Sequence, residues 1–183
     1  MTARIKLDQL LLPDEATDHI QGPASAPVTL IEYGDFECPS CFQAYAALKI
    51  MLPHFGPQVR FVFRHFPLRE AHPHAELAAE AAEAAGAQGK FWPMHELLFT
   101  NQQHLTEKHL LDYAARLGLD MPRYRNEMSD HVYLQRVQEH VLGGRHLGLQ
   151  ATPAFYLNGV FTKVSSDLKK DLHEAIDQAL LAS

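Results

Sequence analysis

The sequence predicts an α/β fold in which a β-α-β half and a β-β-α half are separated by a long helical insertion. Apolar runs with strand periodicity occur towards both ends of the chain, whereas residues 68–149 have helical periodicity almost throughout. The two cysteines follow directly after the first of these runs. Because 183 residues suit one domain with an insertion, we divide the chain into an N-terminal arm, residues 1–26, and a domain, residues 27–183.

The first half begins with a strand at residues 28–33, a turn at 34–37 and a helix at 38–54. Residues 59–66 alternate with period two and predict the second strand. A helix that joins two neighbouring strands makes them parallel, with a right-handed crossover. Four apolar residues of this helix are expected to face the core: Phe42, Tyr45, Leu48 and Leu52.

The insertion divides into helices with short connections. We expect them at residues 74–85, 91–99, 106–118, 123–128 and 131–147. The first is rich in alanine, and three glutamates are expected to mark its solvent-exposed face: Glu76, Glu80 and Glu83. Thr106 has the residue type of an N-cap, and Gly118 has that of a C-terminal stop.

In the second half, two apolar runs at residues 154–157 and 160–164 flank an Asn-Gly pair at 158–159. An Asn-Gly pair between two such runs predicts a β-hairpin with a type I′ turn. A final amphipathic helix follows, and either Ser165 or Ser166 is its expected N-cap.

Cys38 and Cys41 are the only cysteines, and they enclose Pro39 and Ser40 at the strand-to-helix turn. This placement is typical of thioredoxin-like redox sites. Backbone N–H groups and the helix dipole stabilise negative charge at a helix N-terminus, so we expect a reactive thiolate at Cys38. Cys38 would attack a disulfide and the buried Cys41 would resolve the product. A structural staple is not expected, because so short a disulfide loop contributes little chain entropy.

The formal net charge of −6 argues against nucleic acid and anionic membranes as main partners. No apolar run approaches the roughly 18 residues that span a bilayer. The apolar residues 10–12 are too few for a secretory signal, and acidic residues surround them. The sequence as given therefore predicts a cytoplasmic location and no membrane partner.

Four segments make the chain resemble the DsbA-like branch of the thioredoxin superfamily. They are Gly34-Asp35-Phe36-Glu37-Cys38-Pro39-Ser40-Cys41, Phe63-Arg64-His65-Phe66-Pro67-Leu68, His72-Pro73-His74-Ala75, and Ala151-Thr152-Pro153-Ala154-Phe155-Tyr156-Leu157-Asn158-Gly159. The resemblance covers residues 24–183. It implies a thioredoxin fold with an all-helical insertion, and the activity of a thiol–disulfide oxidoreductase.

The resemblance also implies roles for residues outside the cysteine motif. In the family, the proline at the position of Pro153 has a cis peptide bond beside the two cysteines. Its loop, which here includes Thr152, offers backbone groups to a substrate peptide. The family carries a buried acid six residues before the first cysteine, which here is Glu32. On a strand covered on both faces, Glu32 could relay a proton from Cys41 through water, whereas an exposed position would exclude this role.

Pro39 and Ser40 are expected to tune the redox potential. The best-known DsbA oxidants have a histidine where this chain has Ser40. A serine hydroxyl supplies no cation, so we expect a potential below the value of about −120 mV given for DsbA. The exchange needs neither a metal nor an organic cofactor. The expected substrates are protein or small thiols and disulfides, together with a redox partner of the thioredoxin or glutathione type.

Three other functions fit parts of the sequence. Cys38 and Cys41 could bind zinc with His65, His72 or His74, although a zinc ribbon usually has a second Cys-x-x-Cys. Kappa-class glutathione transferases and related isomerases share the insertion plan, but they usually have serine at the attacking position. A redox sensor or a peptide-binding module would use the same motif without turnover. Three aromatic residues near the motif could form an apolar rim for unfolded substrate: Tyr33, Phe36 and Phe42.

Overall fold

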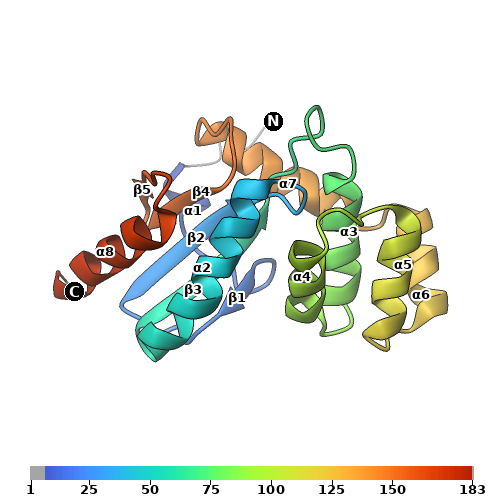
Figure 1. The fold of residues 1–183 in the computed structure, drawn as a ribbon, viewed down its shortest axis with the longest axis horizontal. Coiled ribbons are helices and arrows are strands. Elements are labelled where there is room, and N and C mark those ends of the chain that lie inside the picture. The colour runs from blue at the N-terminus through green and yellow to red at the C-terminus, as the bar shows by residue number, and fades with distance from the viewer. Residues whose placement is uncertain (1–6, 183) are drawn as a thin grey trace. The chain divides into compact units, whose positions relative to one another are not determined.

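The computed structural model describes residues 7–182 (Figure 1). Residues 1–6 of the expected N-terminal arm lie outside the described residues. The strands are β1 (His19–Gln21), β2 (Val28–Gly34), β3 (Val59–His65), β4 (Ala154–Leu157) and β5 (Val160–Thr162). The α-helices are α1 (Leu7–Leu10), α2 (Pro39–Phe55), α3 (Ala75–Gly86), α4 (Phe91–Thr100), α5 (Glu107–Arg116), α6 (Met121–Ser129), α7 (Leu134–His146) and α8 (Leu168–Leu181).

The described chain forms two compact units. The sheet unit comprises residues 43–64, residues 143–182 and the described residues up to Gly34. The helical unit comprises residues 35–42 and 65–142. The chain passes from one unit to the other at four points, which are the end of β2 and positions within α2, β3 and α7.

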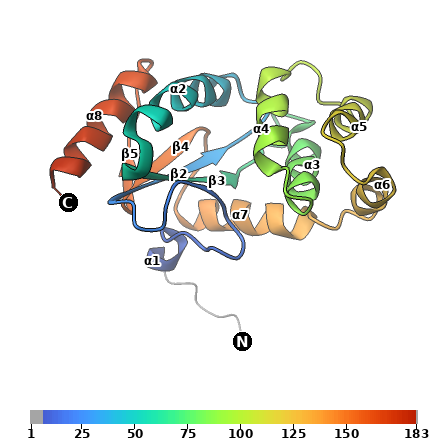
Figure 2. The same ribbon diagram turned by 90° about the horizontal axis from the view of Figure 1, so that it is seen from below.

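The sheet unit confirms the expected α/β fold. Its five strands lie in the order β1-β3-β2-β4-β5, so the two strands joined by α2 are neighbours. β2 and β4 are antiparallel, and α8 packs against both of them. The hairpin of β4 and β5 turns at Asn158 and Gly159, whose φ angles of 47° and 81° are those of the expected type I′ turn. Figure 2 shows α2 and α8 on one side of these strands and α1 on the other.

The N-terminal arm contains a strand that the sequence did not predict. β1 pairs antiparallel with the edge of β3, and Ile20 lies opposite Val62. Arg64 fixes the preceding segment, because its guanidinium donates to both carboxylate oxygens of Asp18 at 2.8 and 2.6 Å. It also donates to the carbonyl of Leu12 at 2.9 Å. Three residues are too few to show strand periodicity, so β1 depends on these tertiary contacts.

The buried face of α2 differs from the expected one. Phe42 is 40% exposed, and Tyr45 and Leu52 are only half-buried. The buried residues begin one position earlier in the helix: Cys41, Ala44, Ala47, Leu48, Met51 and Phe55. Two adjacent apolar stripes fit the same helical period, so spacing alone could not select between them.

The sequence predicted the C-terminal stop of α5 correctly, but it did not predict the N-cap interactions of α5 and α8. Thr106 occupies the N-cap position of α5, but its hydroxyl lies 2.9 Å from the ring of His109 and makes no cap hydrogen bond. Gly118 follows α5 with a φ of 69°, as a C-terminal stop requires. The N-cap of α8 is Asp167 rather than a serine, and its carboxylate accepts from the N–H of Lys170 at 3.3 Å.

In the helical unit α3 packs against α4, α5 and α6, as both ribbon views show (Figures 1 and 2). The predicted solvent face of α3 is wrong, because Glu80 and Glu83 are only 2% and 1% exposed. Alanine side chains let neighbouring helices pack closely, so every residue from Ala78 to Ala85 is buried. Glu83 Oε1 lies 2.8 Å from His65 Nε2, and Arg136 donates to its Oε2 at 3.2 Å. These basic partners replace the solvent that the charge pattern of α3 suggested.

Glu80 is expected to give the helical unit a pH-dependent stability. Burial raises the pKa of Glu80 above its ordinary value of 4.5, and the hydrogen bond with His131 offsets this only in part. Because the pKa of Glu80 is higher in the folded than in the unfolded state, its protonated carboxyl stabilises the fold. This stabilisation is fully present below pH 4.5 and is lost as the pH rises through the folded-state pKa. We therefore expect wild type to lose stability relative to Glu80→Gln as the pH rises above 4.5.

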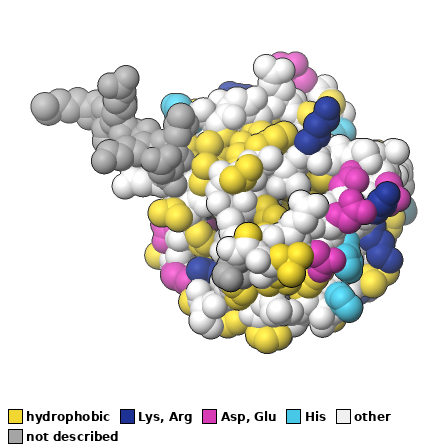
Figure 3. All heavy atoms as spheres, turned by 90° about the vertical axis from the view of Figure 1, so that its left-hand side faces the viewer, with side chains coloured by type: hydrophobic (Ala, Val, Ile, Leu, Met, Phe, Trp, Pro, Cys, Tyr) yellow, Lys and Arg dark blue, Asp and Glu magenta, His cyan; other side chains and the backbone are white. Residues whose placement is uncertain are grey.

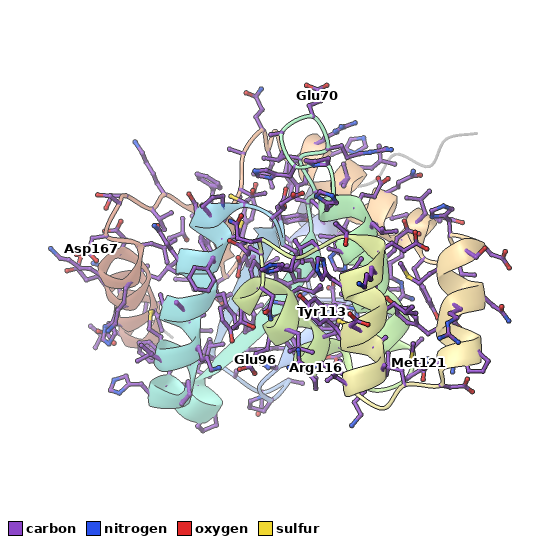
Figure 4. The ribbon with its side chains drawn as sticks, turned by 45° about the vertical axis from the view of Figure 1, so that its right-hand side comes forward. Glu70, Glu96, Tyr113, Arg116, Met121 and Asp167 are labelled. Carbon is purple, nitrogen blue, oxygen red and sulfur yellow. The ribbon has the colours of Figure 1, made fainter. Side chains whose placement is uncertain are left out.

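Urea unfolding of both proteins across this pH range measures the difference in free energy of unfolding. Glu96→Gln is the matched control, since Glu96 is an exposed glutamate of the neighbouring α4 (Figure 4). A difference between wild type and Glu80→Gln that does not change with pH would contradict the buried position of the Glu80 carboxylate.

Exposed apolar side chains gather along the edge strand of the sheet unit. Val160 and Phe161 of β5 are more than half exposed. The face shown in Figure 3 carries several hydrophobic patches with acidic side chains beside them.

None of the helices within residues 7–182 combines the length and the apolar composition that crossing a lipid bilayer requires.

Candidate active site

Cys38 lies at the N-terminus of α2, within one residue of the expected helix start. The helix begins at Pro39, where a missing N–H costs no helical hydrogen bond. The carbonyl of Cys38 accepts from the N–H groups of Cys41 and Phe42 at 3.1 and 3.2 Å. Cys41 therefore lies within the first turn of α2. Cys38 lies just before this turn, where the positive end of the helix dipole acts on it.

The two cysteines differ in their access to solvent. Cys41 is fully buried, and Cys38 is 7% exposed. Pro39 and Ser40 between them are exposed. The backbone N–H of Asp35 points at Cys41 Sγ with a distance of 3.4 Å. Of the two cysteines, only Cys38 is therefore partly exposed at the surface, where a substrate could reach it.

Asp35 organises the polypeptide around the cysteines. Its carbonyl accepts from the N–H of Cys38 at 3.2 Å. Its side chain is fully buried, with Oδ1 accepting from the N–H of Glu37 and Oδ2 from the N–H of Leu68, both at 2.8 Å. Nδ1 of His72 lies 2.7 Å from the same Oδ2. One carboxylate thus fixes both the turn before Cys38 and the loop that carries His72.

His72 is a basic residue close to the motif. Partial burial acts most strongly and opposes its protonation, but the hydrogen bond and the negative charge of Asp35 outweigh this effect. Together with the charges of Cys38 and Glu37, they raise the pKa of His72 above its ordinary value. His72 is therefore more readily protonated than an ordinary histidine, at a site where the charge of Cys38 acts on it.

Two further residues hold the motif in place. Gln102 follows α4 and donates to the carbonyls of Phe36 and Cys38 at 2.8 and 2.9 Å. Glu37 accepts from the N–H of His74 at 2.7 Å, and its other oxygen lies 2.8 Å from His74 Nδ1. The histidines considered for a zinc site thus each direct one ring nitrogen at a carboxylate: His65, His72 and His74.

Of the three aromatic residues expected to form an apolar rim, only Phe42 is exposed. Tyr33 and Phe36 are almost fully buried. Phe36 packs against the rings of His95 and Phe99, with centroid distances of 5.5 and 4.9 Å. Their packing role excludes a role in contacting substrate, because buried rings cannot meet an external peptide.

The remaining predicted residues lie in the sheet unit. Glu32 of β2 is buried and lies opposite Phe155 of β4. The burial of Glu32 is therefore compatible with the predicted proton-relay role, which an exposed position would have excluded. The Thr152–Pro153 peptide bond is cis, and both residues are half-buried directly before β4. The pairing of β2 with β4 thus brings Glu32 close to the strand that follows Pro153.

Comparison with known sequences now identifies the family. A family model described as thioredoxin matches residues 14–178. The chain belongs to the thioredoxin family.

This thioredoxin-family chain is also similar to parts of longer proteins. It is 47% identical over 153 residues to Na(+)/H(+) antiporter NhaA 1 of Salinispora arenicola (strain CNS-205). It is 40% identical over 156 residues to Na(+)/H(+) antiporter NhaA of Herminiimonas arsenicoxydans. These alignments cover 84% and 85% of this chain, but only 23% and 25% of the antiporters. The chain thus spans about a quarter of the length of these relatives.

Several solved structures have the same fold. A thioredoxin-like oxidoreductase from Silicibacter pomeroyi DSS-3 has a TM-score of 0.79 at 26% identity, covering 98% of this chain and 100% of that one. Oxidised BdbD from Bacillus subtilis has a TM-score of 0.81 at 24% identity, covering 92% and 96%. α-DsbA1 from Wolbachia pipientis has a TM-score of 0.79 at 21% identity, covering 97% and 99%. The likeness to BdbD and to α-DsbA1 shows that this chain shares their fold.

Sequence reasoning missed the polar residues that support this thioredoxin-family motif. Asp35, Glu37 and His72 lie in segments that carried the resemblance, but nothing in their spacing showed how they pair. Asp35 and His72 are 37 residues apart, and Gln102 is 64 residues from Cys38. The acidic Asp35 and Glu37 before the motif were a usable signal, since buried carboxylates need partners.

Proposed function

We propose that this chain is a thiol–disulfide oxidoreductase that works through Cys38 and Cys41. The observation that carries the proposal is the position of Cys38 before the first turn of α2, with the buried Cys41 inside that turn, in a chain of the thioredoxin family. The helix dipole favours the Cys38 thiolate, and the thiolate is the nucleophile of disulfide exchange.

In the proposed reaction, the Cys38 thiolate attacks one sulfur of a substrate disulfide, and the other sulfur leaves as a thiolate. Cys41 then loses its proton and attacks Cys38 Sγ, which releases the second substrate thiolate and forms the Cys38–Cys41 disulfide. The reverse sequence oxidises a substrate dithiol. Glu32 is proposed to take the Cys41 proton through water, and the loop of Thr152 and Pro153 to bind substrate backbone.

The direction of exchange depends on the redox partner. We propose a partner of the thioredoxin or glutathione type and a cytoplasmic location, in which the chain would act as a reductase. Equilibration with glutathione measures the potential. A value near −270 mV would support this direction, and a value above about −180 mV would support an oxidant instead.

The relatives suggest a second candidate, in which the same chemistry serves a particular partner. They are named Na(+)/H(+) antiporters, and they contain a region similar to this chain. We propose that a cysteine pair on a membrane antiporter of this kind is one substrate. Exchange with purified antiporter that is as fast as exchange with a short disulfide peptide would show no such preference and would contradict this candidate.

Cys41→Ser is expected to trap the exchange reaction at its midpoint. Without a resolving thiol, the mixed disulfide between Cys38 and a substrate cannot break down by the internal route. After incubation with glutathione disulfide, mass spectrometry should find one glutathione on Cys38. Wild type should instead form the Cys38–Cys41 disulfide and release glutathione.

Cys38→Ser is the matched control, since it keeps only the buried cysteine. It should gain no glutathione under the same conditions. Faster modification of Cys41 in this control than of Cys38 in Cys41→Ser would contradict the assigned order of attack.

A further inference from the structure

The first turn of α2 contains no side chain that can carry a positive charge. Its residues after Cys38 are Pro39, Ser40, Cys41 and Phe42. Ser40 is exposed and offers a neutral hydroxyl. Stabilisation of the Cys38 thiolate by a cation must therefore come from a residue outside the motif.

The loop before α3 supplies such a residue. His72 is held in this loop by its N–H, which donates to the carbonyl of Leu68 at 2.8 Å. Its ring nitrogen Nδ1 lies 2.7 Å from Asp35 Oδ2, which also accepts from the N–H of Leu68. Asp35 in turn accepts from the N–H of Cys38 through its carbonyl. The hydrogen bonds of one buried residue thus fix the imidazole relative to Cys38.

The charges around His72 favour its protonated form. Asp35, Cys38 and Glu37 are the groups whose negative charge acts on it, against the opposing effect of burial. In the same loop Arg69 pairs with Glu76 at 3.1 Å, and Glu70 at the tip points away from the body (Figure 4). Electrostatic coupling is reciprocal, so the effect of the thiolate on His72 is equally an effect of His72 on the thiolate.

We propose that His72 is a positioning residue whose imidazolium, held by Asp35, supplies the Cys38 thiolate with the positive charge that Ser40 lacks. The inference rests on the proposed function, because it explains how Cys38 becomes the attacking sulfur. It also assigns Asp35 a role, which is to keep His72 in place and protonated.

The proposal couples a proton to the redox step. When a substrate dithiol reduces the Cys38–Cys41 disulfide, two electrons enter, the Sγ–Sγ bond breaks and the substrate forms its own disulfide. The substrate releases two protons in this step. One protonates Cys41, and His72 takes the other wherever it is neutral in the oxidised protein, while Cys38 remains a thiolate.

His72→Gln is expected to raise the pKa of Cys38 by about one unit, which is about a tenfold decrease in the acid dissociation constant of the thiol. Thiolate ultraviolet absorbance measured against pH gives this value without any turnover. Because the thiolate belongs to the reduced form, at a pH above the pKa of Cys38 in both proteins the equilibrium with glutathione should shift about tenfold towards the disulfide, or about 30 mV for two electrons.

His74→Gln is the matched control. It lies two residues away, its ring is 42% exposed, and it pairs with Glu37 rather than with Asp35. This variant should leave the pKa of Cys38 at the wild-type value. If His72→Gln and His74→Gln shift the pKa of Cys38 equally, or if neither shifts it, the proposal is wrong.

A measurement on wild type tests the coupling without any substitution. Histidine ring signals titrated by NMR should give a higher pKa for His72 in the reduced protein than in the oxidised one, because only the reduced form carries the thiolate. Equal values in the two forms would overturn the proposal. Exchange activity assayed separately distinguishes this outcome from a failure of the proposed function, since an inactive protein can still show the shift.

Discussion

Cys38→Ser is expected to abolish thiol–disulfide exchange, with a loss of at least about 10³-fold, as removal of a covalent nucleophile produces in other enzymes. A serine hydroxyl does not ionise near neutral pH, and the neighbouring Cys41 is fully buried, so no other sulfur can begin the reaction. The measurement is the rate at which the reduced protein reduces a disulfide peptide, followed by the release of peptide thiol.

The fold has to be shown intact for this result to bear on the mechanism. Cys38 is 7% exposed and its backbone makes the hydrogen bonds of the motif, so the conservative change to serine should leave the circular dichroism spectrum and the urea midpoint close to wild type. Full exchange activity in a folded Cys38→Ser protein would overturn both the assigned attacker and the proposed function.

Asp18→Ala is expected to destabilise the sheet unit by about 3–5 kcal/mol, the cost of removing one partner from a buried ion pair. The carboxylate of Asp18 is 1% exposed and receives two hydrogen bonds from Arg64, which is itself 7% exposed. Without Asp18, the guanidinium stays buried without its counter-charge. The backbone N–H of Asp14 also loses its acceptor. Urea unfolding at neutral pH measures the change.

Glu15→Ala is the matched control, because it removes the partner of another arginine on the same strand. Glu15 is 68% exposed although its partner Arg60 is only 11% exposed, so water can take the place of the Glu15 carboxylate, and its loss should cost less than the loss of Asp18. Equal costs for the two substitutions would contradict the buried character of the Asp18–Arg64 pair and its role in fixing the N-terminal arm.

The strands that the sequence predicted are those whose signals are local. Alternating or continuous apolar runs located β2, β3 and β4 within one residue, and the Asn158-Gly159 pair located the hairpin. β1 was missed because three residues carry no periodicity, and its segment is fixed by Arg64 from a distance of 46 residues along the chain. The face of α2 was assigned wrongly because two apolar stripes fit one helical period.

The candidate site divides in the same way. Cys38 and Cys41 were recognisable because two cysteines three positions apart at a strand-to-helix turn are a local pattern. The support of the motif by Asp35, His72 and Gln102 was not recognisable, since each pairing joins distant segments. Glu83 shows the opposite error, because an acidic residue on a helix suggests solvent unless the basic partner is known.

The sequence by itself determined where the reactive sulfur lies, because a helix start and its dipole are set by the residues around the turn. It also determined the order of strands and helices from β2 to α8, because backbone periodicity is encoded within each of these segments. Only the tertiary structure decided which charges meet: Asp18 with Arg64, Glu83 with His65, and Asp35 with His72. A buried charge requires an opposite partner, but chain folding alone decides which of the many distant candidates is brought within hydrogen-bond distance.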